Sequence, residues 1–467
     1  MKKANMIKRP NKRLMLFLTS LSGLALLTTT YGFIWYICYA QAIVQPFFRK
    51  GNWLVIAIYA LMLYIFMRIY GGFRIGYLKR SDVIYSAILS MLITNVLNYL
   101  QIGLIGRRFM NFVPILILTI TDIFILIIWA FFSEKLYYRL YPPRRILLIY
   151  GGNQAEDLLS KMSSRSEKYN ICGAIAVTEG LESICQAIGR YEAVLICDVK
   201  SDMRNELLKY CFRQSVRVYL TLKLSDTIIR GAEAIHLFDS PLLLCRNKGL
   251  DFGQQAAKRI LDLAISSTAL VLTSPIMAMI AIMIKCYDRG PVLYQQERLT
   301  EGGRIFTLYK FRSMVVDAER LDGPRLASEN DQRITPIGKI LRMIRLDELP
   351  QLINIIKGEM SIVGPRPERK EIAQQYALDM PEFDFRLKVK AGLTGYAQVY
   401  GKYNTSPHDK LKMDLTYIEG YSLWLDIKII LMTIKVLFTR ESSQGIPDDA
   451  PNQLFNRGEK PRMRVKR

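Results

Sequence analysis

Residues 342–368 read RMIRLDELPQLINIIKGEMSIVGPRPE, and this stretch decides how the C-terminal half of the chain is interpreted. Asp347 and Glu348 lie just before Pro350, which suits the first turn of a helix, so both carboxylates are expected near a helix N-terminus. Adjacent carboxylates can ligate Mg²⁺ while one of them attacks a phosphorus atom, and neighbouring Arg and Lys side chains can hold phosphate oxygens. The alternative is a solvated helix face with capping acids, and an Asp-Glu pair by itself favours that alternative.

Basic segments precede the two acids. Thr335-Pro336 forms a good N-cap with proline at the first helical position, which predicts a basic amphipathic helix carrying Lys339, Arg342 and Arg345. Further upstream, residues 306–314 read FTLYKFRSM. The acids are therefore surrounded in sequence by positive charge.

An apolar segment at residues 260–284 precedes these motifs and is long enough for a fifth membrane span. Ser274 and Pro275 interrupt it near the middle, because proline removes a helix hydrogen bond and clashes with the preceding turn. Asp262 lies at its start, and a full span would place the C-terminal half of the chain outside the cell. We therefore predict a re-entrant helix over residues 258–285 that enters and leaves by the cytoplasmic face. A plain fifth helix with a proline kink is the alternative.

Residues 1–140 contain four apolar runs, each close to or above the roughly 18–20 residues that span a bilayer as a helix. We predict four transmembrane helices here, because buried soluble helices rarely supply four such runs in succession. The runs are Leu14–Ala40, Trp53–Tyr70, Val83–Ile105 and Phe112–Phe132.

Asp122 falls inside the fourth run, where a carboxylate is a candidate functional group. No second ionisable residue lies at that depth. We therefore prefer a packing contact with Asn95, Asn98 or Gln101 of the third run.

The net charge of +23 is concentrated at the N-terminal end. Residues 1–145 hold 18 Lys and Arg against three acids, which is 15 of the 23 net positive charges. A basic region rich in apolar runs indicates a membrane, with nucleic acid as the rival interpretation, and the chain has no nucleic-acid recognition motif. The positive-inside rule places both ends in the cytoplasm, with a clear bias at the N-terminus and a weaker one elsewhere.

Residues 144–245 alternate between strand-like and helix-like segments, which predicts a parallel sheet in a Rossmann-like α/β domain. The first turn, GGNQA at residues 151–155, resembles a phosphate-binding loop but lacks the GxGxxG spacing. We prefer an ordinary strand–helix turn to a nucleotide site. The expected strands are Arg145–Tyr150, Ile171–Val177, Ala193–Asp198 and Val216–Leu220, with helices at Ala155–Ser163 and Met203–Arg213.

Length and composition exclude several classes of protein. A chain of 467 residues exceeds the roughly 250–300 residues that one hydrophobic core organises. The hydrophobic content of 51% excludes a disordered chain, and seven scattered Cys without a CxxC pair exclude a secreted disulfide scaffold. The two His, His236 and His408, nearly exclude His triads and His-rich zinc sites.

The combination of KFRSM, LDELPQL, VGPRPE and a Ser-Pro-interrupted apolar helix resembles the bacterial polyprenyl-phosphate glycosyl-1-phosphate transferases. The resemblance is close over residues from about 250 to 440, and four spans followed by a Rossmann-like domain match the large members of the family. It implies a mainly helical α+β catalytic domain over residues 250–467. It also implies Asp347 as the nucleophile, Glu348 as its partner, and both carboxylates as ligands of a Mg²⁺ cofactor.

The resemblance extends to residues outside the acidic pair. Lys310, Arg342 and Arg366 match basic residues that bind substrate phosphate, and Ser274 and Pro275 match the break in the re-entrant helix.

Residues 423–438 are too short to span a bilayer, and they fit an interfacial helix and a core helix equally well.

The resemblance implies an activity, its substrates and its location. Hexose-1-phosphate would pass from a UDP-sugar, UDP-glucose or UDP-galactose, to undecaprenyl phosphate through a covalent Asp347 intermediate, with release of UMP. The reaction would initiate exopolysaccharide, capsule or O-antigen synthesis at the inner leaflet of the bacterial cytoplasmic membrane, with the catalytic domain in the cytoplasm. A non-catalytic membrane scaffold for polysaccharide assembly is the alternative. No nucleic-acid partner is expected, and the sequence leaves open a homodimer and a ligand of the middle domain.

Overall fold

The structure is a computed structural model and describes residues 11–48, 50–152, 154–163, 165–245, 249–316, 331, 333–401 and 405–437. The chain divides into two compact units, Met1–Thr221 and Leu222–Arg467, and each is described by itself.

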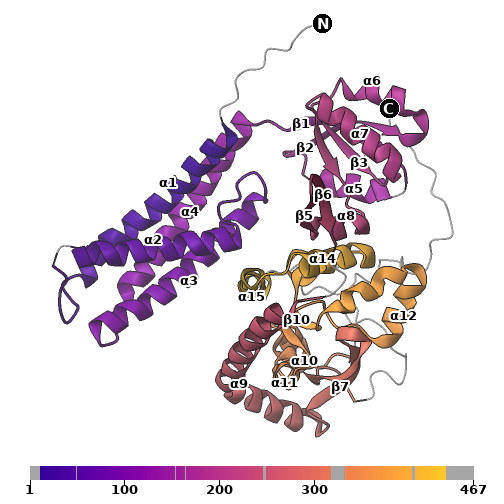
Figure 1. The fold of residues 1–467 in the computed structure, drawn as a ribbon. Coiled ribbons are helices and arrows are strands. Elements are labelled where there is room, and N and C mark those ends of the chain that lie inside the picture. The colour runs from indigo at the N-terminus through magenta and orange to yellow at the C-terminus, as the bar shows by residue number, and fades with distance from the viewer. Residues whose placement is uncertain are drawn as a thin grey trace. The chain divides into compact units, whose positions relative to one another are not determined.

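Four long apolar helices open the first unit (Figure 1). They confirm the helical character of the four predicted apolar runs, and each is long and apolar enough to cross a membrane. Their buried faces share one apolar cluster, in which Tyr31 stacks on Tyr59 with ring centroids 3.9 Å apart. The helices are α1 (Lys12–Ile34), extended by the π-helical turn η1 (Trp35–Tyr39), α2 (Lys50–Tyr70), α3 (Arg80–Gly106) and α4 (Val113–Leu140).

The predicted partner of Asp122 is wrong. Asp122 is fully buried on α4, and its Oδ1 accepts a hydrogen bond from Thr30 Oγ1 of α1 at 2.7 Å. Asn95 of α3 bonds elsewhere, because its Oδ1 accepts from Tyr59 and its Nδ2 donates to Thr119 Oγ1 at 2.9 Å. Helix α4 packs against both α1 and α3, and the carboxylate faces α1.

A four-stranded parallel sheet of order β2-β1-β3-β4 follows in the same unit. It confirms the predicted parallel sheet, and each strand agrees with its predicted range to within two residues. Helix α5 covers one face of the sheet, and α6 and α7 cover the other, so the two central strands are buried on both sides. The elements are β1 (Arg144–Tyr150), α5 (Gln154–Ser163), β2 (Tyr169–Ala176), η2 (Val177–Glu179), α6 (Leu181–Ile188), β3 (Ala193–Cys197), α7 (Ser201–Arg213) and β4 (Arg217–Leu220).

The second unit begins after β4, so the sheet ends before the predicted domain boundary at residue 245. It opens with α8 (Leu224–Arg230), which packs against α14, and the antiparallel hairpin of β5 (Glu233–Leu237) and β6 (Ser240–Leu244). The remaining elements are α9 (Phe252–Asp288), β7 (Leu293–Leu299), η3 (Glu301–Gly303), β8 (Ile305–Phe311), α10 (Pro336–Met343), η4 (Leu346–Glu348), α11 (Gln351–Lys357), β9 (Ser361–Val363), α12 (Lys370–Asp379), η5 (Pro381–Lys388), β10 (Gly392–Thr394), α13 (Tyr396–Tyr400), α14 (Pro407–Glu419) and α15 (Leu423–Leu437).

Two further two-stranded sheets and a main apolar core organise the rest of this unit. Strands β7 and β8 pair antiparallel, and the short strands β9 and β10 pair parallel. The core is built from β8, α11, β9, α14 and α15. Helix α15 packs into this core through the fully buried Ile429, as the core-helix alternative predicts, while Trp424 of the same helix is 58% exposed.

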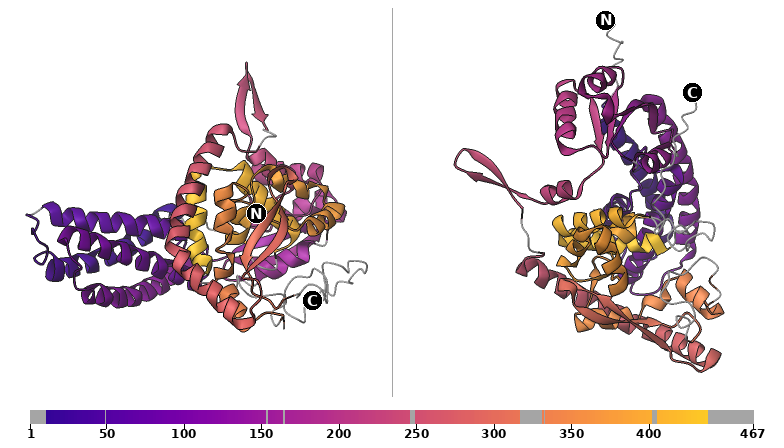
Figure 2. Two further views of the ribbon diagram at one scale, coloured as in Figure 1. Left: turned by 90° about the horizontal axis from the view of Figure 1, so that it is seen from below. Right: turned by 90° about the vertical axis from the view of Figure 1, so that its right-hand side faces the viewer.

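Helix α9 is the fifth described helix long and apolar enough to cross a membrane. It is assigned as one helix of 37 residues with Ser274 and Pro275 inside it, and its axis bends between its two ends (Figures 1 and 2). Pro275 cannot donate to the carbonyl of Val271, and Ser274 Oγ donates to that oxygen instead at 2.8 Å. The serine hydroxyl thus satisfies the backbone group that the proline leaves free.

Candidate active site

Asp347 and Glu348 lie together on η4, the single 3₁₀ turn between α10 and α11. Arg345 just before this turn has φ 55°, a left-handed conformation that directs the chain away from α10. Asp347 is 8% exposed, and the Glu348 side chain is 12% exposed. The structure therefore places the two predicted carboxylates in a largely buried turn, and the solvated-face alternative is excluded.

Two cations from distant segments meet at Glu348. Lys310 Nζ of β8 lies 3.1 Å from Glu348 Oε1. Arg366 comes three residues after the end of β9, and its Nη2 lies 2.9 Å from the same oxygen. Both cations were predicted as phosphate-binding residues. The structure brings them together on Glu348 and leaves Asp347 beside them.

Burial and charge separate the two carboxylates. Burial, and then the charge of adjacent Glu348, raise the pKa of Asp347 above its usual range, although the nearby cations oppose this. Burial also opposes ionisation of Glu348, but the charges of Lys310 and Arg366 outweigh it and hold the pKa of Glu348 below its usual range. Glu348 is therefore the firmly ionised member of the pair, and Asp347 is the more basic one.

Two further arginines act on this turn. The charge of Arg342, in the last turn of α10, helps to lower the pKa of Asp347, and that of Arg345 helps to lower the pKa of Glu348. The prediction that Arg345 belongs to the basic helix is wrong, because α10 ends at Met343. Arg345 was not predicted as a site residue from the sequence. Its position directly before Leu346-Asp347-Glu348 could have indicated that its charge acts on the two carboxylates.

The backbone around Arg366 is held on several sides. Strands β9 and β10 pair, and beyond them Gly364 N donates to Thr394 O at 2.9 Å. Arg386 Nη2 donates to the carbonyl oxygen of Arg366 at 2.9 Å. A Cβ at Gly364 would collide with the carbonyl oxygen of Lys390, so this close approach requires glycine.

Asn354 of α11 holds the strand that carries Lys310. It is fully buried, its Nδ2 donates to Thr307 O at 2.7 Å, and its Oδ1 accepts from Tyr309 N at 3.1 Å. A second Nδ2 hydrogen bond reaches Glu359 Oε2 at 2.6 Å. One amide therefore fixes β8 immediately before Lys310.

Replacing Asn354 by Ala is expected to destabilise the catalytic unit. The change leaves Thr307 O and Tyr309 N buried without their partner, at a cost of about 1–3 kcal/mol for each group. Thermal unfolding of the purified protein, monitored through its loss of solubility, should show a lower melting temperature. Gln375→Ala on the exposed face of α12 is the matched control and should leave that temperature unchanged. An unchanged value for Asn354→Ala would contradict this role.

Ser274 and Pro275 do not join the cluster around Asp347 in the described part of the chain. They lie in the middle of α9, whose side chains are largely exposed there, as Val271 and Leu272 at 71% each show. The contact that the structure shows for this pair, Ser274 Oγ to the carbonyl oxygen of Val271, bears on the shape of the helix.

The two carboxylates fit Mg²⁺ in one particular mode. In the described segments, no group of three or more His, Cys, Asp and Glu lies close enough together to hold a metal ion alone. Mg²⁺ is commonly bound by one or two carboxylates together with substrate phosphates, which matches a pair at a phosphate-binding cluster. Because Oε1 of Glu348 is engaged by two cations, the candidate ligands are the other oxygen of Glu348 and the Asp347 carboxylate.

Comparison with known proteins connects this geometry to a family. A family model described as bacterial sugar transferase matches residues 253–440, which include every residue of the cluster. A UDP-N-acetylgalactosamine-undecaprenyl-phosphate N-acetylgalactosaminephosphotransferase of Aeromonas hydrophila is 35% identical over 54% of this chain and 60% of its own. A UDP-glucose:undecaprenyl-phosphate glucose-1-phosphate transferase of Klebsiella pneumoniae is 36% identical over 56% of each chain. The match thus spans less than two thirds of either relative.

A shorter relative is covered more fully. A UDP-glucose:undecaprenyl-phosphate glucose-1-phosphate transferase of Caulobacter vibrioides is 37% identical over 193 residues, which are 40% of this chain and 71% of the relative. The residues that the family model matches all lie in the second unit. On these matches, the chain belongs to the bacterial sugar transferase family.

Proposed function

We propose that this chain transfers hexose-1-phosphate from UDP-glucose or UDP-galactose to undecaprenyl phosphate, with release of UMP. One observation carries the proposal: a buried Asp-Glu pair in which Lys310 and Arg366 converge on Glu348. Cations at this spacing can bind the phosphates of a nucleotide sugar beside the carboxylate of Asp347. One relative is named for transfer of glucose-1-phosphate and another for transfer of galactose phosphate. These names, together with the sequence motifs, support this substrate class.

Asp347 is the proposed nucleophile of the first step. Its carboxylate attacks the phosphorus that bears the sugar, a new O–P bond forms, and the bond from that phosphorus to the bridging oxygen breaks. UMP leaves with the electron pair of that bond. Two arguments favour Asp347 over Glu348: an oxygen of Glu348 is held by two cations, and the raised pKa of Asp347 makes its carboxylate the stronger nucleophile.

The second step returns Asp347 to its starting state. A phosphate oxygen of undecaprenyl phosphate attacks the same phosphorus, the bond to Asp347 breaks, and undecaprenyl-diphosphate-sugar is formed. A covalent intermediate lets one site serve a water-soluble donor and a lipid acceptor in turn. The low pKa of Glu348 makes it a weak base, so we assign it to holding Lys310 and Arg366 in place. Mg²⁺ bound by the two carboxylates would neutralise charge on the diphosphate.

We also propose that α9 is re-entrant, entering the membrane and leaving it by the cytoplasmic face. Near its N-terminal end Lys258 pairs with Asp426, and at its C-terminal end Asp288 pairs with Arg312. Both partners belong to the same catalytic unit. A helix that crossed a hydrocarbon core of about 30 Å would place these contacts on opposite faces of the bilayer. We propose four crossings for α1 to α4 in the bacterial cytoplasmic membrane, with the catalytic unit in the cytoplasm.

Cysteine labelling tests this topology. Cys245 and Cys286 lie on either side of the apolar part of α9, and both are exposed. In variants that keep one of them and replace the other six cysteines by Ser, an impermeant maleimide should label neither in intact cells and both after permeabilisation. Labelling of Cys286 in intact cells, with Cys245 protected, would instead indicate a spanning helix.

UMP release tests the proposed activity directly. Purified protein receives Mg²⁺, undecaprenyl phosphate and one UDP-sugar at a time, from a panel that includes UDP-glucose, UDP-galactose and UDP-N-acetylgalactosamine. We expect UMP with UDP-glucose or UDP-galactose. Release of UMP with no member of the panel would refute the proposal, and release with UDP-N-acetylgalactosamine alone would refute the choice of sugar.

A further inference from the structure

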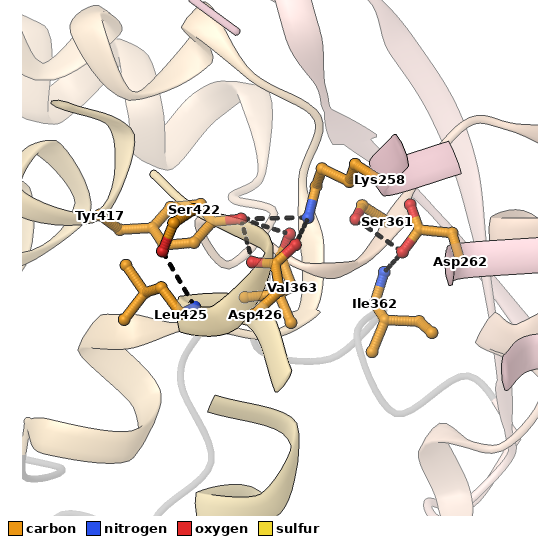
Figure 3. Close-up of polar contacts among 9 residues, drawn as sticks. All are labelled: Lys258, Asp262, Ser361, Ile362, Val363, Tyr417, Ser422, Leu425 and Asp426. Atoms are coloured by element: carbon orange, nitrogen blue, oxygen red, sulfur yellow. Dashed lines mark hydrogen bonds and ion pairs between the residues drawn. The ribbon is translucent and has the colours of Figure 1, made fainter. Parts of the chain in front are cut away.

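A buried acid on α9 is not used by the proposed chemistry. Asp262 is 3% exposed, and its Oδ1 accepts two hydrogen bonds from β9: from Ser361 Oγ at 3.0 Å and from Ile362 N at 2.9 Å (Figure 3). Burying a carboxylate is costly unless it is well bonded, so the contact ties α9 specifically to this strand.

A second contact, one helical turn earlier, acts on the same strand. Lys258 Nζ lies 2.6 Å from Asp426 Oδ2 and donates to the Tyr417 hydroxyl at 3.0 Å. That hydroxyl lies 2.8 Å from Asp426 Oδ1 and 3.3 Å from the carbonyl oxygen of Val363, the last residue of β9 (Figure 3). Residues 258 and 262 are one turn apart and face the same side of α9. Every residue of β9 is therefore tied to this face of α9, directly or through Tyr417.

Strand β9 leads straight into the active site. Gly364 and Pro365 follow Val363, and the next residue, Arg366, holds Glu348 at 2.9 Å. Only three residues lie between Ile362 and Arg366, so a shift of β9 is passed to Arg366 over a short stretch of chain. A displacement of about 1 Å at a reacting centre can reduce the rate about 100-fold.

We propose that Asp262 is a positioning residue of the transferase: by fixing β9 to α9 it sets the place of Arg366 against Glu348. The inference rests on the proposed function and goes beyond it, because it couples the apolar helix to the phosphate-binding cluster. Asp262 acts only through the strand and touches no reacting atom. Its two hydrogen bonds need an acceptor, which an amide oxygen can replace and a methyl group cannot.

The test compares three variants by the kcat and KM of UMP release. Asp262→Ala is expected to lower kcat about 10–100-fold, with a smaller change in KM. Asp262→Asn keeps an acceptor for both bonds and should retain most of the wild-type kcat. Asp251→Ala is the matched control, because Asp251 lies at the start of the same helix and its carboxylate accepts from Gln254 N, inside the α9 N-terminal cap. It should keep the wild-type kcat.

A double-mutant cycle with Arg366→Lys separates positioning from general support of the fold. If Asp262 acts through Arg366, adding Asp262→Ala to Arg366→Lys should reduce kcat by less than threefold. Equal losses in both backgrounds, or a wild-type kcat for Asp262→Ala, would overturn the inference.

Two further results bear on the inference: a failure of Asp262→Ala to fold and an inactive wild type. If Asp262→Ala does not fold, Ser361→Ala, which removes one of the two bonds, replaces it in the cycle. A several-fold loss of kcat that disappears in the Arg366→Lys background supports the inference, and no loss overturns it. If the wild-type protein releases no UMP from any UDP-sugar, the proposed function has failed and this inference fails with it. If the wild type releases UMP and Asp262→Ala has the wild-type kcat, the positioning role alone is removed.

Discussion

Replacing Asp347 by Asn is expected to lower UMP release by a factor of about 10⁴ or more, because the amide cannot attack phosphorus. The substitution keeps the size of the side chain and removes one negative charge beside Glu348. Since the charge of Glu348 is among the causes that raise the pKa of Asp347, removal of the Asp347 charge relieves a repulsion within the pair. The variant should therefore be at least as stable as the wild type and remain in the membrane fraction.

Asp379→Asn is the matched control for this variant. It makes the same chemical change at an exposed position at the end of α12 and should leave turnover unchanged. UMP release and membrane content are measured on the same preparations. Substantial turnover by Asp347→Asn would remove Asp347 from the nucleophile role and contradict the proposed mechanism.

Replacing Glu348 by Gln is expected to lower turnover about 10²–10³-fold through a different route. Lys310 and Arg366 both lie within 3.1 Å of one oxygen of Glu348 and lose their shared counter-charge. Burial already lowers the pKa of Lys310, and the charge of Glu348 opposes this most strongly, so the variant favours the neutral amine. A weakened phosphate-binding pair should appear as a higher KM for the UDP-sugar as well as a lower kcat.

Two companion variants make this result specific. Glu348→Asp keeps the charge with a shorter reach and should fall between the wild type and Glu348→Gln. Glu371→Gln, at an exposed position in the first turn of α12, makes the same change outside the site and should behave as the wild type. Equal activity of Glu348→Gln and wild type would show that the two cations do not depend on this carboxylate.

Periodicity and residue type predicted the local elements well. The continuous apolar sequences of β1 and β3 reflect strands buried on both faces, and the four long apolar runs became helices. These features depend on neighbours along the chain. The partner of Asp122 depends on which helices pack together, and the pattern of one run cannot show that α4 turns its carboxylate towards Thr30 of α1.

In the active site too, the residues could be predicted from the sequence, whereas the contacts between distant segments could not. The resemblance predicted Asp347, Glu348, Lys310 and Arg366 as site residues, and the structure brings them together. It did not predict that both cations would converge on Glu348, because β8 and the segment after β9 meet only in the folded unit. The Asp262–Ser361 contact joins residues 99 positions apart, and the Lys258–Asp426 pair joins residues 168 apart. Sequence spacing carries no signal for contacts at such separations.

The most direct test of the proposed mechanism is the mass of the Asp347 peptide after purified protein has met UDP-glucose or UDP-galactose with Mg²⁺ and without undecaprenyl phosphate. We predict a hexose-phosphate adduct on Asp347, formed together with UMP and removed when undecaprenyl phosphate is added. Formation of the lipid product by the wild type with no adduct at any stage, or an adduct on a different residue, would contradict a covalent mechanism through Asp347.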